Sequence, residues 1–182
     1  MNEKVDSQLI VIFGASGDLT GRKLIPSLYE LHKRDLLPEK LCVMGAARTE
    51  YTDEEFRNIQ RENLEHSQKG KELKPGDIDA FLEHICYVSF DSGKSSDYYK
   101  LKDRITEKQT ALNLPDKVMY YLATPPQMYD LIPQYLQENG MNVAATPEGW
   151  RRVIIEKPFG TSLETARALN NKLMSIFDEK EI

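Results

Sequence analysis

The sequence predicts an α/β fold, in which one three-layer domain spanning residues 1–182 is built around a doubly wound parallel sheet. Two observations support this prediction. Short apolar runs recur along the chain without alternation, as expected of parallel strands that are buried on both faces. The segments between them are polar and carry apolar residues at helical spacing, so strand and helix alternate. The composition, 40% hydrophobic and 29% charged, is that of an ordinary globular domain.

Five apolar runs are the candidate strands. Each is too short for a typical helix, and each is followed by polar or small residues. The run that ends at Phe90 is the weakest. The five runs are Leu9–Phe13, Leu41–Gly45, Ile85–Phe90, Val118–Leu122 and Val153–Glu156.

The segments between these runs predict helices. Apolar residues are spaced for one helical face at Leu24, Leu28 and Leu31 and again at Leu101, Ile105 and Leu112. Two capping boxes, Thr52 with Glu55 and Ser162 with Thr165, open helices predicted over 56–64 and 166–177. Prolines 125 and 126 suit the first turn of another helix, and the polar stretch 67–79 predicts an exposed loop.

Charge and composition exclude several classes of function. A net charge of -5 argues against a nucleic-acid binder that relies on a basic surface. There is no apolar run long enough to span a membrane and no secretory signal, so we expect a cytoplasmic protein. Cys42 and Cys86 lie within apolar runs and are expected to be buried thiols. His32, His66 and His84 have no partners at metal-ligand spacing, so we expect surface histidines and no metal site.

A glycine-containing turn follows the first predicted strand and precedes a helix. Gly14 is placed to make the tight turn, and Gly17 lets a pyrophosphate approach the amides at the helix N-terminus. This arrangement is typical of a Rossmann-type dinucleotide site, although Thr20 stands where the usual pattern has its third glycine. The alternative is a purely structural turn.

The end of the second predicted strand indicates which dinucleotide is preferred. NAD sites usually have an acidic residue there for the ribose 2′-hydroxyl, whereas this strand continues into Ala46-Ala47-Arg48. A guanidinium can pair bidentately with a phosphate, so Arg48 favours the 2′-phosphate of NADP. The alternative is a solvated arginine after a strand.

Three further strand ends carry candidate site residues. Ala123, Thr124 and Pro125 follow the fourth run, where the ribose and nicotinamide of a cofactor would cross the sheet edge, or where a stiff turn is simply needed. Asp91-Ser92 follows the weak third run and has a similar location, although both are common loop residues. After the last run, Lys157 could supply a positive charge to a ligand, or pair with Glu156 as a structural ion pair.

Together these motifs resemble the coenzyme domain of glucose-6-phosphate dehydrogenase. The resemblance rests on Gly-Ala-Ser-Gly-Asp-Leu at 14–19, the corner at 45–48, Tyr-Leu-Ala-Thr-Pro-Pro at 121–126 and Glu-Lys-Pro-Phe-Gly at 156–160. It implies NADP-dependent oxidation of glucose 6-phosphate to 6-phosphogluconolactone, the first step of the oxidative pentose phosphate pathway, by a protein that is a homo-oligomer when intact.

The resemblance also implies roles for individual residues. Lys157 would contact the sugar phosphate beside the nicotinamide, and Lys23 would lie near the same cleft. The residues expected to bind cofactor are Gly14, Ala15, Ser16, Gly17, Asp18, Leu19, Arg48, Asp91, Ser92, Ala123, Thr124, Pro125 and Lys157.

One feature of the family has no counterpart in this sequence. The family's general-base histidine lies farther along the chain, and none of His32, His66 and His84 matches it. We therefore expect an N-terminal fragment that lacks the substrate domain and is inactive alone. Two alternatives stay open: a small self-sufficient NADP reductase, and a dinucleotide-binding module without catalytic activity.

Overall fold

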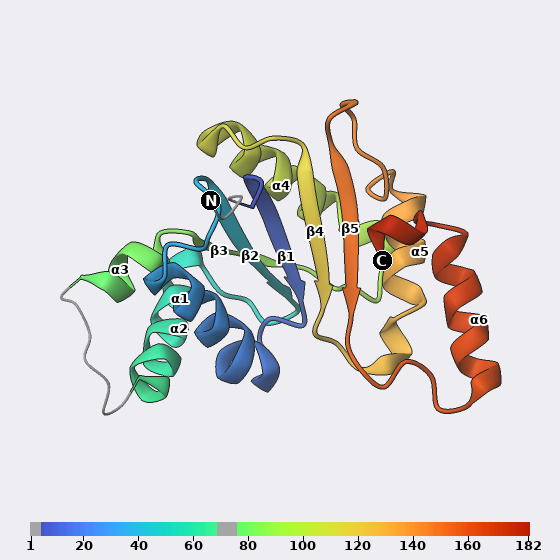
Figure 1. Cartoon of the computed structure of the whole chain (residues 1–182), viewed down its shortest axis with the longest axis horizontal. Helices are drawn as coiled ribbons and strands as arrows, with labels where there is room; N and C mark the ends of the chain where they lie inside the picture. The colour runs from blue at the N-terminus through green and yellow to red at the C-terminus, as the bar shows by residue number, and fades with distance from the viewer. Residues whose placement is uncertain (1–4, 69–75) are drawn as a thin grey trace.

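The computed structural model describes residues 5–68 and 76–182 and contains a five-stranded parallel sheet in the order β3-β2-β1-β4-β5 (Figure 1). The strand order reverses at β1, which pairs with β2 on one side and β4 on the other. This is the doubly wound Rossmann arrangement, so the predicted fold class is confirmed. The strands are β1 (Gln8–Phe13), β2 (Leu41–Ala47), β3 (Ile85–Ser89), β4 (Lys117–Leu122) and β5 (Trp150–Ile155).

Helices lie on both faces of the sheet, and each face has its own apolar core (Figure 1). One face carries α1 (Ile25–Lys33), α2 (Asp53–Ser67) and α3 (Asp77–Leu82), which pack on the β1–β3 half. The other face carries α4 (Tyr98–Leu112), α5 (Leu131–Glu138) and α6 (Leu163–Met174).

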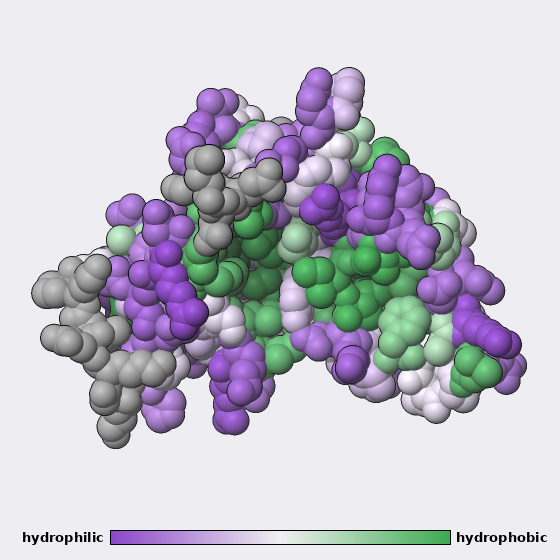
Figure 2. Space-filling model, in the orientation of Figure 1, coloured by the Kyte–Doolittle hydropathy of each residue, from purple (hydrophilic) through white to green (hydrophobic). Residues whose placement is uncertain are grey.

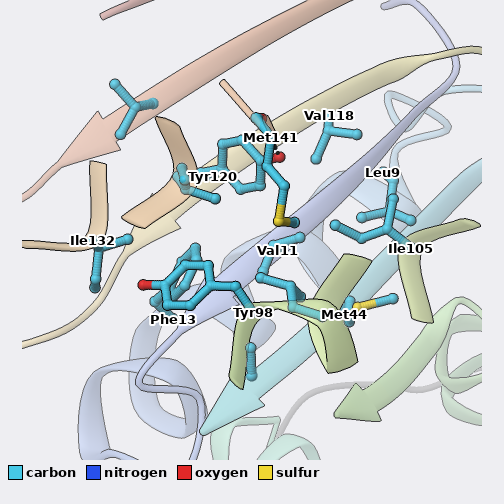
Figure 3. Close-up of a cluster of buried hydrophobic side chains, with 14 of the residues drawn as sticks. Leu9, Val11, Phe13, Met44, Tyr98, Ile105, Val118, Tyr120, Ile132 and Met141 are labelled. Atoms are coloured by element: carbon cyan, nitrogen blue, oxygen red, sulfur yellow. Dashed lines mark hydrogen bonds between the residues drawn. The ribbon is translucent and has the colours of Figure 1, made fainter. Parts of the chain in front are cut away.

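The larger core lies between the sheet and α4 and α5. Phe13 from the central strand is fully buried there and makes an edge contact with Phe90. Tyr98 and Tyr120 lie beside it, and the Tyr120 hydroxyl donates to the Met141 carbonyl at 2.8 Å, so the buried polar tip is satisfied (Figure 3). This core fixes β1, the strand that leads into the glycine turn.

One side of β4 and β5, the side that faces away from α4 and α5, is less buried than predicted. Burial on both faces holds for β1, β2 and most of β3, but β4 and β5 alternate between buried and partly exposed residues. The reason is that α1, α2 and α3 cover only the other half of the sheet. Apolar atoms are therefore visible over β4 and β5 in Figure 2. We call this surface the open face; it comprises Lys117, Met119, Tyr121, Trp150, Arg152 and Ile154.

The predicted helix signals are largely confirmed. Both capping boxes form, at Thr52 and at Ser162, but the last helix ends at Met174 and not at Phe177. The two prolines open a 3-10 turn (Pro126–Met128), and α5 begins only at Leu131. Residues 69–75, the middle of the predicted loop over 67–79, lie outside the described residues. The prediction is wrong at the end of this stretch, because α3 already begins at Asp77.

The sequence predictions for cysteine and histidine are partly confirmed. Cys42 and Cys86 are buried free thiols whose sulfur atoms lie 3.4 Å apart. His66 is exposed, as predicted, but His32 and His84 are half-buried, because both rings pack in an aromatic cluster beside Phe81. Within residues 5–68 and 76–182, no helix has the length and apolarity to cross a bilayer, and no three acidic, histidine or cysteine side chains gather around a potential metal position.

Candidate functional site

The turn after β1 is tight because Gly14 adopts a left-handed conformation, with φ of 78°. A Cβ at this position would lie 2.4 Å from the Ala123 carbonyl oxygen, so the neighbouring end of β4 leaves no room for a side chain. Ala15 is buried below the turn. The chain then enters a π-helical segment, Thr20–Leu24, that leads into α1.

Hydrogen bonds divide the amides of this turn into two groups. Gly14 and Ala15 donate to the Ala46 carbonyl at 2.9 and 3.3 Å, and Gly17 donates to Gly14 at 2.9 Å. The amides of Ser16 and Asp18 take no part in these turn hydrogen bonds. With Leu19, they lie at the start of a helix, where free N–H groups and the helix dipole favour an anion.

A cavity of about 650 Å³ lies at the carboxyl ends of β1 to β4. Seven residues predicted from the sequence to bind cofactor line it: Gly14, Ser16, Arg48, Asp91, Ser92, Thr124 and Pro125. Because parallel strands end at the same edge of the sheet, segments more than a hundred positions apart meet here. The volume is in the range of ordinary ligand sites.

The charges around this cavity favour an anionic ligand. Arg48 is exposed, and in the described part of the chain its guanidinium has no carboxylate within 4.0 Å. Asp91 is the acidic lining residue, but its carboxylate accepts from the Gly93 amide at 3.0 Å and lies 3.4 Å from the Lys94 ammonium. Among the described residues that line the cavity, Arg48 therefore carries the one free positive charge.

One buried polar atom in the cavity wall is unsatisfied. The Thr124 hydroxyl oxygen is inaccessible and has no hydrogen-bond partner. Buried hydroxyl groups without a partner are uncommon in folded proteins. A ligand could reach this oxygen only after rotation of the Thr124 side chain, so the groups that fit a phosphorylated dinucleotide here are the free amides and Arg48.

Other predicted residues lie near the cavity but do not line it. Gly17 and Asp18 are exposed on the turn, and the Asp18 carboxylate pairs with Arg22 at 2.7 Å. Ala123 donates its amide to the Phe13 carbonyl and so joins the ends of β4 and β1. Lys23 is exposed on the π-helical segment.

Lys157 lies one strand farther along the same sheet edge, two residues after the end of β5, and its side chain is exposed. The expected alternative of a structural pair with Glu156 is wrong in this structure, since the Glu156 carboxylate instead accepts a hydrogen bond from the Tyr121 hydroxyl. No ion pair involves Lys157 in the described ranges 5–68 and 76–182. Its ammonium is thus available to a ligand.

The structure adds lining residues that the sequence analysis missed: Ala47, Thr49, Gly93 and Met128. The first three are sequence neighbours of predicted residues, so widening each motif by one position would have found them. Met128 carried no signal, because its place depends on the 3-10 turn after Pro125.

The histidines lie away from this cavity. The His84 ring is 3.2 Å from the carbonyl oxygen of Leu41, the first residue of β2, and its ring packs against His32. Both therefore lie toward the amino ends of the strands, opposite the cavity. His66 is near the end of α2, a helix that begins beside the carboxyl edge and runs away from it. No histidine of the described residues is placed to act on a ligand in the cavity.

Comparison with known proteins identifies the family. The sequence model described as "Glucose-6-phosphate dehydrogenase, NAD binding domain" matches residues 11–182. A glucose-6-phosphate 1-dehydrogenase of Aggregatibacter actinomycetemcomitans is 42% identical over 98% of this chain, and one of Treponema pallidum is 38% identical over 97%. The chain spans about a third of the length of these relatives, 35% and 34%.

Solved structures agree with the sequence comparison. A glucose-6-phosphate dehydrogenase in complex with its substrate glucose-6-phosphate superimposes with a TM-score of 0.81, at 31% identity, over 100% of this chain and 37% of its own. The enzyme from Mycobacterium avium gives 0.79 at 30% identity, over 97% and 35%. The chain therefore belongs to the glucose-6-phosphate dehydrogenase family and corresponds to its NAD binding domain.

Proposed function

We propose that the chain binds NADP and is the coenzyme-binding part of a protein that oxidises glucose 6-phosphate at C1 to 6-phosphogluconolactone. The observation that carries the cofactor assignment is the position of Arg48, an unpaired cation in the wall of a cavity whose other charged lining residue, Asp91, is already neutralised. A guanidinium there favours binding of a 2′-phosphate, whereas none of the described lining residues offers a free carboxylate to a 2′-hydroxyl.

In this proposal, different groups of residues around the cavity bind different parts of the cofactor. The amides of Ser16, Asp18 and Leu19 would bind the pyrophosphate, with Gly14, Ala15 and Gly17 shaping the turn. A second group would hold the ribose and nicotinamide side: Asp91, Ser92, Ala123, Thr124 and Pro125. The bound nicotinamide supplies the hydride acceptor.

The substrate assignment draws on the relatives. A structural neighbour with a TM-score of 0.81 is described in complex with its substrate glucose-6-phosphate. In this chain we assign Lys157 to the sugar phosphate, because its ammonium is unpaired at the carboxyl edge, and we place Lys23 near the same cleft. Since no described histidine faces the cavity, the base that removes the C1 hydroxyl proton would come from outside these residues.

Two further properties belong to the proposal. We assign the protein to the cytoplasm, in line with a relative from Arabidopsis thaliana that is 32% identical and named cytoplasmic. We also expect the intact protein to form a homo-oligomer, with residues 1–182 as its NADP-binding domain.

The test is calorimetric titration of the purified chain with NADPH and NADH, for the wild type and Arg48→Ala. A charge-assisted bidentate contact contributes roughly 1.5 to 3 kcal/mol, so the variant should bind NADPH about ten- to a hundredfold more weakly while its NADH affinity changes little. Arg34→Ala, which removes an exposed arginine after α1, is the matched control. An equal loss for both cofactors would contradict the assignment of Arg48.

A further inference from the structure

Tyr121 and Glu156 meet on the open face, at the carboxyl ends of neighbouring strands. The register of β4 and β5 pairs Tyr121 with Ile154, and Glu156 follows two positions later on the same face. The Tyr121 hydroxyl donates a hydrogen bond to Oε1 of Glu156, and both residues are half-buried. Burial raises the pKa of Tyr121, and the hydrogen bond to Glu156 raises it further.

A half-buried carboxylate needs a donor or a cation, because its desolvation is otherwise uncompensated. The cation closest to Glu156 in sequence is Lys157, the next residue along the chain. Yet Glu156 takes its hydrogen bond from Tyr121, and in the described part of the chain the Lys157 ammonium has no carboxylate within 4.0 Å. The tyrosine hydroxyl therefore occupies Oε1 of Glu156, while the neighbouring lysine ammonium has no carboxylate partner.

We propose that Tyr121 is a positioning residue, which holds the Glu156 carboxylate on the open face and so leaves the Lys157 ammonium free to bind an anionic ligand group at the carboxyl edge of the sheet. The ligand part of this inference rests on the proposed function. The contact between Tyr121 and Glu156, and its effect on Lys157, can be tested without any ligand.

The test measures how fast an acylating reagent, sulfo-N-hydroxysuccinimide acetate, modifies Lys157 at neutral pH, followed by peptide mass spectrometry. In Tyr121→Phe the released Glu156 carboxylate is expected to pair with Lys157, and an ion-paired ammonium is a poorer nucleophile. Since exposed pairs are weak, we expect modification to slow by about two- to fivefold. Lys23, exposed and remote from Glu156 in sequence, is the internal reference within each sample.

Two further variants separate this effect from a general disturbance. Glu156→Gln removes the carboxylate and should not slow modification of Lys157, and the double variant Tyr121→Phe/Glu156→Gln should react like Glu156→Gln alone. Tyr99→Phe changes a tyrosine that is 56% exposed and should have no effect. Circular dichroism checks that each variant is folded.

The outcomes distinguish this inference from the proposed function. An unchanged Lys157 rate in folded Tyr121→Phe would overturn the positioning role, as would a slow rate that persists in the double variant. Neither result would change the NADPH affinities expected for the wild type and for Arg48→Ala, so the proposed function would stand. Conversely, if the chain bound NADPH and NADH equally, the cofactor assignment would fail while the modification rates still reported on Tyr121.

Discussion

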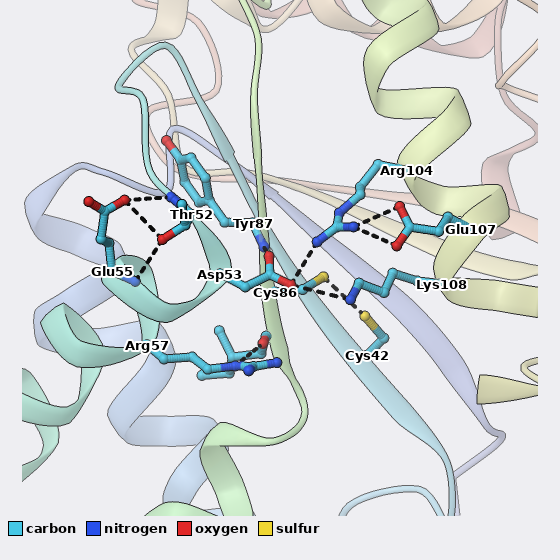
Figure 4. A network of polar contacts seen from close by, with 11 residues as sticks. Cys42, Thr52, Asp53, Glu55, Arg57, Cys86, Tyr87, Arg104, Glu107 and Lys108 are labelled. Atoms are coloured by element: carbon cyan, nitrogen blue, oxygen red, sulfur yellow. Dashed lines mark hydrogen bonds and ion pairs between the residues drawn. The ribbon is translucent and has the colours of Figure 1, made fainter. Parts of the chain in front are cut away.

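The Asp53 carboxylate accepts a hydrogen bond from the main-chain amide of Tyr87 at 2.8 Å, so the first residue of α2 pairs with the outer edge of β3 (Figure 4). One helical turn later, the Arg57 guanidinium donates to the Ile85 carbonyl at 2.7 Å. Unpaired edge strands recruit other strands, and side chains that occupy their main-chain groups prevent this. The β3 edge is thereby closed by two residues of one helix.

The same carboxylate joins the edge strand to α4. Arg104 and Lys108 lie 2.7 and 3.3 Å from Oδ2 of Asp53, and all three side chains are largely buried (Figure 4). We expect Asp53→Ala to lower the free energy of unfolding by about 2 to 3 kcal/mol, since it leaves an amide and two cations without their acceptor. Urea denaturation is the measurement, with the exposed Asp103→Ala as control. Equal stability of the two variants would contradict a structural role for Asp53.

Stability should fall in alkaline solution. Burial raises the pKa of Tyr87 to about 12, and burial likewise raises the pKa values of Tyr29 and Tyr98. Because these tyrosines ionise less readily in the folded state, they contribute fully to stability at pH values below the unfolded-state tyrosine pKa of about 10. This contribution is lost as the pH rises above about 10 and the unfolded state ionises first. Urea midpoints measured from pH 8 to 12 should therefore decrease above pH 10. A midpoint that stays constant from pH 9 to 11 would rule this out.

The two glycines of the turn should respond differently to substitution. A Cβ at Gly17 would lie 3.1 Å from the Gly14 carbonyl oxygen, a close but isolated contact. The φ angle of Gly17 is not in the left-handed region, so we expect Gly17→Val to fold. It should lose measurable NADPH binding, because the branched side chain lies beside the free amides. Gly14→Ala should instead lose stability, given the 2.4 Å approach to Ala123. Thermal melts and titrations separate the two effects; a folded Gly17→Val that binds NADPH normally would refute the phosphate turn.

The open face should make the isolated chain self-associate, because it exposes apolar side chains such as Ile154, which is 38% accessible. Ile154→Lys should weaken association by about tenfold or more, since a buried isoleucine contributes roughly 1.5 to 3 kcal/mol. Sedimentation velocity over a concentration series measures this. Val143→Lys, at a loop position that is 62% exposed, is the control, and equal behaviour of the two variants would exclude the open face.

The sequence predicted the strands, their parallel direction and most of the cavity, because these depend on local signals. Apolar runs mark strands, and the residues that follow parallel strands collect at one edge, as Gly14, Arg48 and Thr124 do. The open face was missed because burial of a strand's second face depends on which helices cover it. The hydrogen bond from Tyr121 to Glu156 was also missed, since it depends on the register of β4 and β5, which neither strand's sequence encodes alone.

The position of β1 in the middle of the sheet has a consequence for how the chain folds during synthesis. Its first partner, β2, begins at Leu41, but its second partner, β4, pairs Leu122 with Phe13 across 109 positions of sequence. Such long-range pairings slow folding, and nascent chains grow by only about 5 to 20 residues per second. For several seconds β1 would thus have one unpaired edge beside a half-built core, a state in which a holding chaperone would have an exposed strand to bind.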